Sequence, residues 1–176
     1  MARILTYHEL EQTVYELEKD LLACLSAKEA IFRAKEQLEG IFNAVPDQIA
    51  IVDRHYRIQI VNKSLADKLN GSQERLVGEL CYNCICRADD PPSLCPHAQM
   101  LKDGREHKLE TYNEQLGMYL LVTSSPLYDD EGKLMGGVYV ARDITIYKEI
   151  EKALRESEEK YRLLIENEGF LKRGIS

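Results

Sequence analysis

Residues 134–145 of the chain read LMGGVYVARDIT. The apolar part of this stretch follows an Asp-Asp-Glu-Gly turn and predicts a β-strand. Its last residues, Asp143, Ile144 and Thr145, come directly before a helical pattern that begins at Ile146. The Thr145 hydroxyl can cap such a helix, and the helix dipole favours the Asp143 carboxylate near its N-terminus. The stretch therefore predicts a passage from a sheet into a helix.

Upstream of this stretch, four more segments have the composition of β-strands. The five expected strands are residues 48–52, 56–61, 105–112, 118–127 and 134–142. Short helices are expected at residues 63–69, 72–76 and 97–101. Short polar turns join the first two strands and the last three, and helices connect the two groups, so we expect an α+β fold with a five-stranded antiparallel sheet and short connecting helices.

Apolar residues recur at alternating spacings of three and four near both ends of the chain, which predicts coiled-coil helices. The N-terminal pattern consists of Leu10, Val14, Leu17, Leu21, Cys24, Ile31, Leu38, Phe42 and Val45. The C-terminal pattern consists of Tyr147, Ile150, Leu154, Ser157, Tyr161 and Leu164. An alternative for the N-terminal segment is an amphipathic helix that folds back onto its own domain. Cys24 occupies a seam position, where it serves as a small buried hydrophobe or meets its symmetry mate.

Length and charge limit the classes of function. The chain has 176 residues, 44% hydrophobic and 30% charged, with a net charge of -7. That size fits one domain with extensions. The acidic balance argues against binding nucleic acid, which requires clustered Lys and Arg. We see neither a run of about 20 apolar residues nor a signal peptide, so we expect a cytoplasmic protein that does not span a membrane.

Four of the five cysteines fall within fifteen positions, at Cys81, Cys84, Cys86 and Cys95, and His97 follows them. In a reducing compartment such a cluster indicates metal binding or redox activity rather than structural disulfides. Zinc takes four thiolate or imidazole ligands, and thiolates also hold iron–sulfur clusters. Reversible disulfide formation and inert buried thiols are further alternatives. The Cys-x2-Cys-His pattern of covalent haem attachment is absent.

The element order, the Asn62 and Ala66 pair after the second strand, and the Asp143-Ile144-Thr145 exit together resemble a PAS domain over about residues 38–148. In that family the exit motif passes movement of the sheet to the following helix. The resemblance therefore implies that Asp143 and Thr145 relay a signal. Residues 154–167 are similar to the linker that often precedes another PAS repeat in sensor kinases.

The cysteine-rich segment resembles a PAS subgroup of sensor histidine kinases that carries a Cys-Tyr pair and a Cys-Pro-His triplet. Cys81-Tyr82 and Cys95-Pro96-His97 match these motifs directly, whereas Cys86 stands where the subgroup more often has histidine. The resemblance implies a metal site, with zinc favoured and an iron–sulfur cluster as the alternative. Its expected ligands are Cys81, Cys86, Cys95 and His97, with Cys84 as an additional thiol.

These observations predict a signalling module and no catalytic residues. The expected divisions are an N-terminal coiled-coil helix at 1–40, a PAS domain at 41–145, a C-terminal signalling helix or linker at 146–168 and a frayed tail at 169–176. We expect a homodimer through the flanking helices that senses a pocket ligand or redox state and signals to a histidine kinase or another signalling protein. The alternatives are a thiol oxidoreductase that uses Cys81 and Cys84, and a purely structural, zinc-stabilised dimerisation module.

Overall fold

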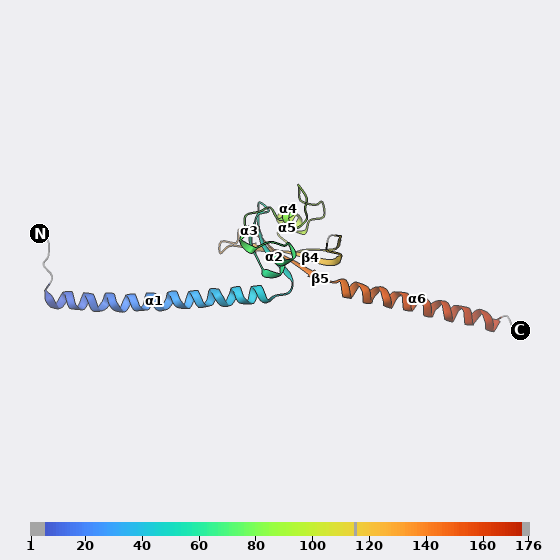
Figure 1. The fold of residues 1–176 in the computed structure, drawn as a ribbon, viewed down its shortest axis with the longest axis horizontal. Helices are drawn as coiled ribbons and strands as arrows, with labels where there is room; N and C mark the ends of the chain where they lie inside the picture. Colours follow the sequence, from blue (N-terminus) through green and yellow to red (C-terminus); the bar gives the residue numbers. More distant parts are fainter. Residues whose placement is uncertain (1–5, 115, 174–176) are drawn as a thin grey trace. The chain divides into compact units, whose positions relative to one another are not determined.

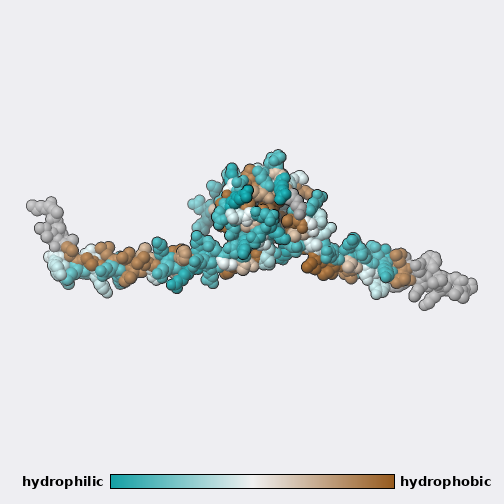
Figure 2. Space-filling model, in the orientation of Figure 1, coloured by the Kyte–Doolittle hydropathy of each residue, from teal (hydrophilic) through white to brown (hydrophobic). Residues whose placement is uncertain are grey.

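The computed structural model describes residues 6–114 and 116–173, with only the backbone described from 165 onward. The chain divides into two compact units between Ala44 and Val45. The first unit is a single helix, α1 (Tyr7–Ala44), none of whose side chains is buried. It continues beyond the expected boundary at residue 40 and ends before Pro46, which cannot donate a backbone hydrogen bond. Figure 2 shows apolar side chains recurring along the visible face of α1.

The second unit contains a five-stranded sheet of β1 (Gln48–Asp53), β2 (Ile58–Val61), β3 (His107–Asn113), β4 (Met118–Tyr128) and β5 (Leu134–Asp143). The strand order is β2-β1-β5-β4-β3, and all the neighbours pair antiparallel. The sheet predicted from the sequence is therefore confirmed. Its strands begin or end within one or two residues of the expected limits.

Four short helices connect β2 to β3 (Figure 1): α2 (Lys63–Lys68), α3 (Gln73–Leu76), α4 (Cys81–Cys84) and α5 (Pro96–Asp103). Asn62 organises the start of this connection. Its side-chain oxygen accepts hydrogen bonds from the Leu65 and Ile49 amides, both at 3.0 Å, so it caps α2 and ties that helix to β1. Its side-chain nitrogen donates to the carbonyls of Val45 and Asp47. The fully buried Asn62 thus fixes the path of the chain into the sheet.

The core consists of two clusters. The larger cluster joins Val52, Ile58, Val61 and Leu65, and the smaller one joins Leu120, Val122 and Ala141. Tyr139 packs against both clusters from the central strand β5. Glycine at 136 is required where β5 passes β1, because a β-carbon there would collide with the Val52 carbonyl oxygen.

The C-terminal helix, α6 (Thr145–Arg173), follows β5 after one residue. Two sequence-based boundaries differ from this helix. It starts at Thr145 rather than Ile146, and it continues through residues 169–173, which we expected to belong to a frayed tail. Residues 174–176 of that tail lie outside the described residues. The helix is amphipathic, and its apolar side chains Ile146, Ile150 and Leu154 are exposed.

Candidate functional site

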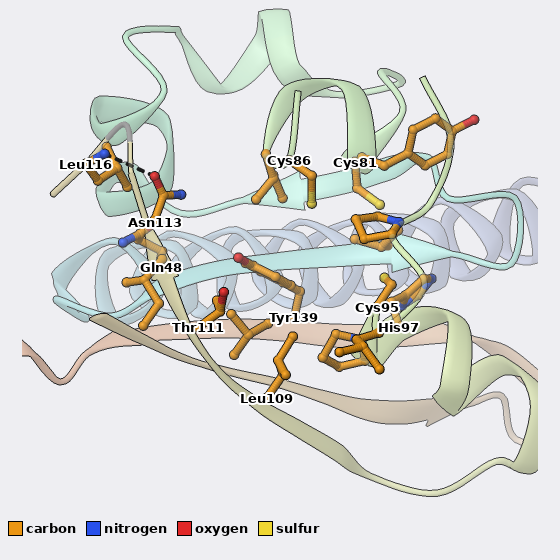
Figure 3. Close-up of a pocket in the computed structure, with 18 of the residues that line it drawn as sticks. Gln48, Cys81, Cys86, Cys95, His97, Leu109, Thr111, Asn113, Leu116 and Tyr139 are labelled. Atoms are coloured by element: carbon orange, nitrogen blue, oxygen red, sulfur yellow. Dashed lines mark hydrogen bonds between the residues drawn. The ribbon is translucent and has the colours of Figure 1, made fainter. Parts of the chain in front are cut away.

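A cavity of about 270 Å³ lies between the inner face of the sheet and the segment that carries α4 and α5 (Figure 3). Small-molecule sites in proteins occupy roughly 300–1,000 Å³, so this cavity is at the lower limit of that range. Three of the five cysteines, Cys81, Cys86 and Cys95, line it together with His97. The sequence-based grouping of these four residues around one site is consistent with their placement.

The cysteines differ in environment. Cys81 is buried at the start of α4, and burial raises the pKa of its thiol to about 12. Cys84, at the other end of α4, packs against the core and is not among the residues that line the cavity. Burial also raises the pKa of the Cys84 thiol. Both side chains are therefore neutral thiols near pH 7, and neutral thiols are poor nucleophiles.

His97 is held from two strands. Its Nδ1 lies 3.3 Å from the hydroxyl of the buried Ser124, and its Nε2 lies 3.1 Å from the Asp53 carbonyl oxygen. Because a carbonyl can only accept, Nε2 carries a proton, and in the neutral imidazole Nδ1 accepts from the Ser124 hydroxyl. Burial lowers the pKa of His97, which favours this neutral form. The Tyr56 ring packs edge-on against the imidazole at 5.5 Å.

This arrangement does not fit a metal centre. Both ring nitrogens of His97 already have protein partners. Within the described ranges 6–114 and 116–173, no three His, Cys, Asp or Glu side chains are placed to hold a metal ion together. Ligation by Cys81, Cys86, Cys95 and His97 would require the imidazole to leave Ser124 and the thiols to converge. The metal site therefore stays a prediction.

The opposite end of the cavity is polar, and it was not predicted from the sequence. In Figure 3 the side chains of Gln48 and Thr111 lie at this end, away from Cys95 and His97, and Tyr139 lies between the two ends. Gln48 is only 5% exposed, although it is a polar residue on an inward-facing strand position. Gln48 lies two and four residues before Ala50 and Val52, so it shares their buried face of the strand. A glutamine at such a position could have identified this end from the sequence.

Two hydrogen bonds join the junction between β5 and α6 to β4. The Tyr119 amide donates to the Thr145 hydroxyl at 3.0 Å, and the Ile144 amide donates to the Tyr119 carbonyl at 2.9 Å. The Thr145 hydroxyl, which we expected to cap the helix, is thus bonded to β4 instead. The Asp143 carboxylate, not the Thr145 hydroxyl, accepts from the first backbone amide of the helix, that of Thr145, at 2.9 Å. Hydrogen bonds from the Thr145 hydroxyl and amide lower the pKa of Asp143.

A charged contact adds to this junction. Lys148, in the first turn of α6, lies 2.7 Å from the Glu110 carboxylate on β3 and 3.2 Å from Glu151. The start of α6 is thus bonded to both β3 and β4.

Among the described residues, none of the helices has the length and apolar character of a membrane span.

Residues 42–149 match the family model described as PAS fold, so the chain belongs to this family. A sensor protein kinase, WalK of Staphylococcus haemolyticus, is 26% identical over 122 residues, which are 69% of this chain and 19% of the kinase. The WalK of Staphylococcus aureus is 24% identical over the same share of this chain and 28% of its own length. The chain thus spans less than a third of these curated relatives.

Solved structures agree on the fold. The PAS domain of BvgS from Bordetella pertussis superimposes with a TM-score of 0.50 at 15% identity, covering 73% of this chain and 98% of that domain. A PAS domain from Colwellia psychrerythraea gives a TM-score of 0.50 at 18% identity, covering 64% of this chain and 98% of that one. These structures agree with the family match on a PAS fold, and the curated relatives are sensor protein kinases. The Cys-Tyr and Cys-Pro-His subgroup remains a resemblance.

Proposed function

We propose that this PAS domain senses a change in its cavity and passes that change through β4 to α6, as part of a dimeric signalling module. The domain performs no catalysis in this proposal. A change in the cavity shifts the helix between two packing arrangements on the sheet, which requires a signal that acts differently on the two.

The proposal is supported mainly by β4, which lines the cavity with some residues and is hydrogen-bonded to the start of α6 through another. Side chains alternate along this strand, so Leu120 and Val122 face the cavity while Tyr119 faces outward. The backbone of Tyr119 holds both Ile144 and Thr145. A displacement of Leu120 by a cavity occupant therefore acts on a residue bonded directly to the start of α6. Interiors are close-packed, so such a displacement is not absorbed locally.

Dimerisation through the flanking helices is part of the proposal. The seam residues Leu10, Val14, Leu17 and Leu21 are each about half exposed or more within the chain. An exposed leucine seam favours burial against a second helix, as in a coiled coil. The similarity to sensor protein kinases supports a histidine kinase, or another signalling protein, as the partner that receives the signal.

The signal itself is a cavity ligand or a change of thiol oxidation state. The alternative of a thiol oxidoreductase at Cys81 and Cys84 is weaker. Burial raises the pKa of both thiols, whereas thiol–disulfide exchange requires a reactive thiolate.

Hydrogen exchange of residues 147–154 tests this proposal. These amides should change their protection when the protein is treated with the thiol oxidant diamide, or when a cavity ligand is added. The Asp143→Ala variant should stay folded but lose that response. Glu149→Ala, an exposed change in the same helical turn, serves as the control and should respond like the wild type. Identical protection in every sample would contradict signal transfer and favour a purely structural role.

A further inference from the structure

The polar end of the cavity contains three side-chain groups without a protein partner. Within residues 6–114 and 116–173, no hydrogen bond engages the Gln48 carboxamide, the Thr111 hydroxyl or the Tyr139 phenol. No fully enclosed polar side-chain atom in the described part of the chain lacks a partner. The three groups therefore keep access to the cavity itself. Gln48 and Tyr139 come from the paired strands β1 and β5, and Thr111 comes from β3 at the far edge of the sheet.

The position of Gln48 is costly unless the cavity holds a matching group. β1 presents Gln48, Ala50 and Val52 to the interior, and the other two are apolar. A carboxamide removed from water without a hydrogen bond lowers stability, so leucine would suit the fold better at this position. Asn113, next to this group, is different, because its side-chain oxygen accepts from the Leu116 amide and has a structural role.

The charge of the cavity selects the class of ligand. Its lining includes no Asp, Glu, Lys or Arg among the described residues. The two ring nitrogens of His97 are engaged by the Ser124 hydroxyl and the Asp53 carbonyl, so the imidazole is not free to pair with a ligand. A charged ligand would lose its hydration and meet no opposite charge, which strongly disfavours binding. The walls around the centre are apolar and include Leu109, Leu120 and Val122.

We propose that the cavity binds a neutral molecule with an apolar body and one hydrogen-bonding end of the carboxamide type, which offers a donor and an acceptor side by side. That end lies against Gln48, Thr111 and Tyr139, because a carboxamide pairs with the Gln48 amide through two complementary hydrogen bonds. The apolar body extends past Leu109 and Val122 toward the thiols. This inference rests on the proposed sensory function and names the class of molecule that occupies the site.

Three probes of nearly the same shape test it: naphthalene-2-carboxamide, 2-acetylnaphthalene and 2-naphthoate. The ketone removes the donor, and the carboxylate adds a charge. Titration of the full chain, followed by protein NMR, should give the tightest binding for the carboxamide. We expect the ketone to bind about tenfold more weakly, the equivalent of one hydrogen bond, and the carboxylate at least about a hundredfold more weakly.

Variants identify the residue that discriminates. Gln48→Leu should make the carboxamide and the ketone bind equally while the chain keeps a dispersed spectrum. Tyr139→Phe should weaken the carboxamide several-fold, and it serves as the readout if Gln48→Leu does not fold. Tyr147→Phe removes the same hydroxyl from an exposed helical position and should change nothing.

Several outcomes would overturn the inference: binding of none of the probes, equal binding of the carboxylate, or a carboxamide preference that survives in both Gln48→Leu and Tyr139→Phe. The sensory proposal fails independently. Carboxamide binding that leaves the exchange of residues 147–154 unchanged would contradict signal transfer and leave the ligand class standing. If those amides respond to diamide but no probe binds, the ligand class would be contradicted and signal transfer would stand.

Discussion

The backbone amide of Tyr119 donates a hydrogen bond to the side-chain hydroxyl of Thr145, 26 residues further along the chain, at 3.0 Å. Tyr119 precedes Leu120, whose side chain lines the cavity, and Thr145 is the first residue of α6. One backbone position on β4 thus lies between the cavity and the helix that leaves the sheet. Signal transfer in this account depends on that bond and on its neighbour from Ile144 to the Tyr119 carbonyl.

Replacing Thr145 with valine should remove the hydroxyl while keeping the shape of the side chain. We expect the domain to stay folded and to lose about 0.5–1.5 kcal/mol of unfolding free energy, the usual contribution of one hydrogen bond. Exchange at Tyr147 and Lys148 should rise more than exchange in the sheet. Thr123→Val is the matched control, because Thr123 is also on β4 and its hydroxyl has no partner among the described residues. Equal effects of the two substitutions would contradict a special role for Thr145.

The Asp143 carboxylate should titrate below its ordinary value. Hydrogen bonds from Thr145 lower its folded pKa, whereas in the unfolded chain it titrates near about 3.9. Its contribution to stability is therefore complete above about pH 4 and is lost as the pH falls through the lower folded value. The Thr145 amide shift, followed by NMR from about pH 6 to about pH 2, should report this midpoint. A midpoint at or above 3.9 would show that the hydrogen bonds do not stabilise the carboxylate.

Deletion of α1 should convert the protein from a dimer to a smaller species. The seam of Leu10, Val14, Leu17 and Leu21 is exposed within the chain, so its burial requires a partner. Light scattering on the full chain at tens of micromolar should give twice the monomer mass. This concentration is on the order of ordinary coiled-coil dissociation constants. Leu17→Asp should weaken the dimer, and Lys19→Asp, an exposed position outside the seam, should not. A monomeric full chain would contradict dimerisation through α1.

The Cys81 thiol should resist alkylation near pH 7. Its pKa of about 12 and its burial leave little thiolate, whereas Cys24 is exposed on α1. Mass spectrometry after iodoacetamide treatment should find Cys24 modified well before Cys81. Faster modification of Cys81 would contradict the neutral environment that the cavity provides.

Metal analysis of anaerobically purified protein tests the metal prediction separately. If the predicted ligands hold one zinc ion per chain, Cys95→Ser should lower both metal content and thermal stability, and Cys24→Ser should change neither. If the wild-type protein is folded and metal-free, the hydrogen-bonded arrangement of His97 describes its resting state.

Composition and turn residues were sufficient to predict the sheet, because β-branched and aromatic runs bounded by turn residues are local features of the sequence. The local sequence was also sufficient to place α6 after Asp143, since capping is a local property. The bond from Tyr119 to Thr145 could not be predicted in the same way. It depends on how β4 and β5 pair, and nothing in the residues around Thr145 carries that information.

The same reason explains the result at the cavity. The spacing of Cys81, Cys86, Cys95 and His97 predicted one shared site, and all four residues line one cavity. The partners of His97, however, come from Asp53 on β1 and Ser124 on β4. These groups are distant in the sequence, so the local motif does not show that they compete with a metal ion for the His97 nitrogens. The polar end was not predicted because Gln48 was interpreted only as part of a strand. That Gln48 shares the buried face of this strand with Ala50 was not considered.

The most direct measurement of the central claim is an NMR titration of the full chain with naphthalene-2-carboxamide, following the amides of Leu120, Tyr119 and Lys148. In the wild type, all three amides should shift along one binding curve. In Thr145→Val, Leu120 should still shift while Lys148 no longer does. A wild-type protein in which Leu120 shifts on binding and Lys148 stays unchanged would contradict transfer from the cavity to α6.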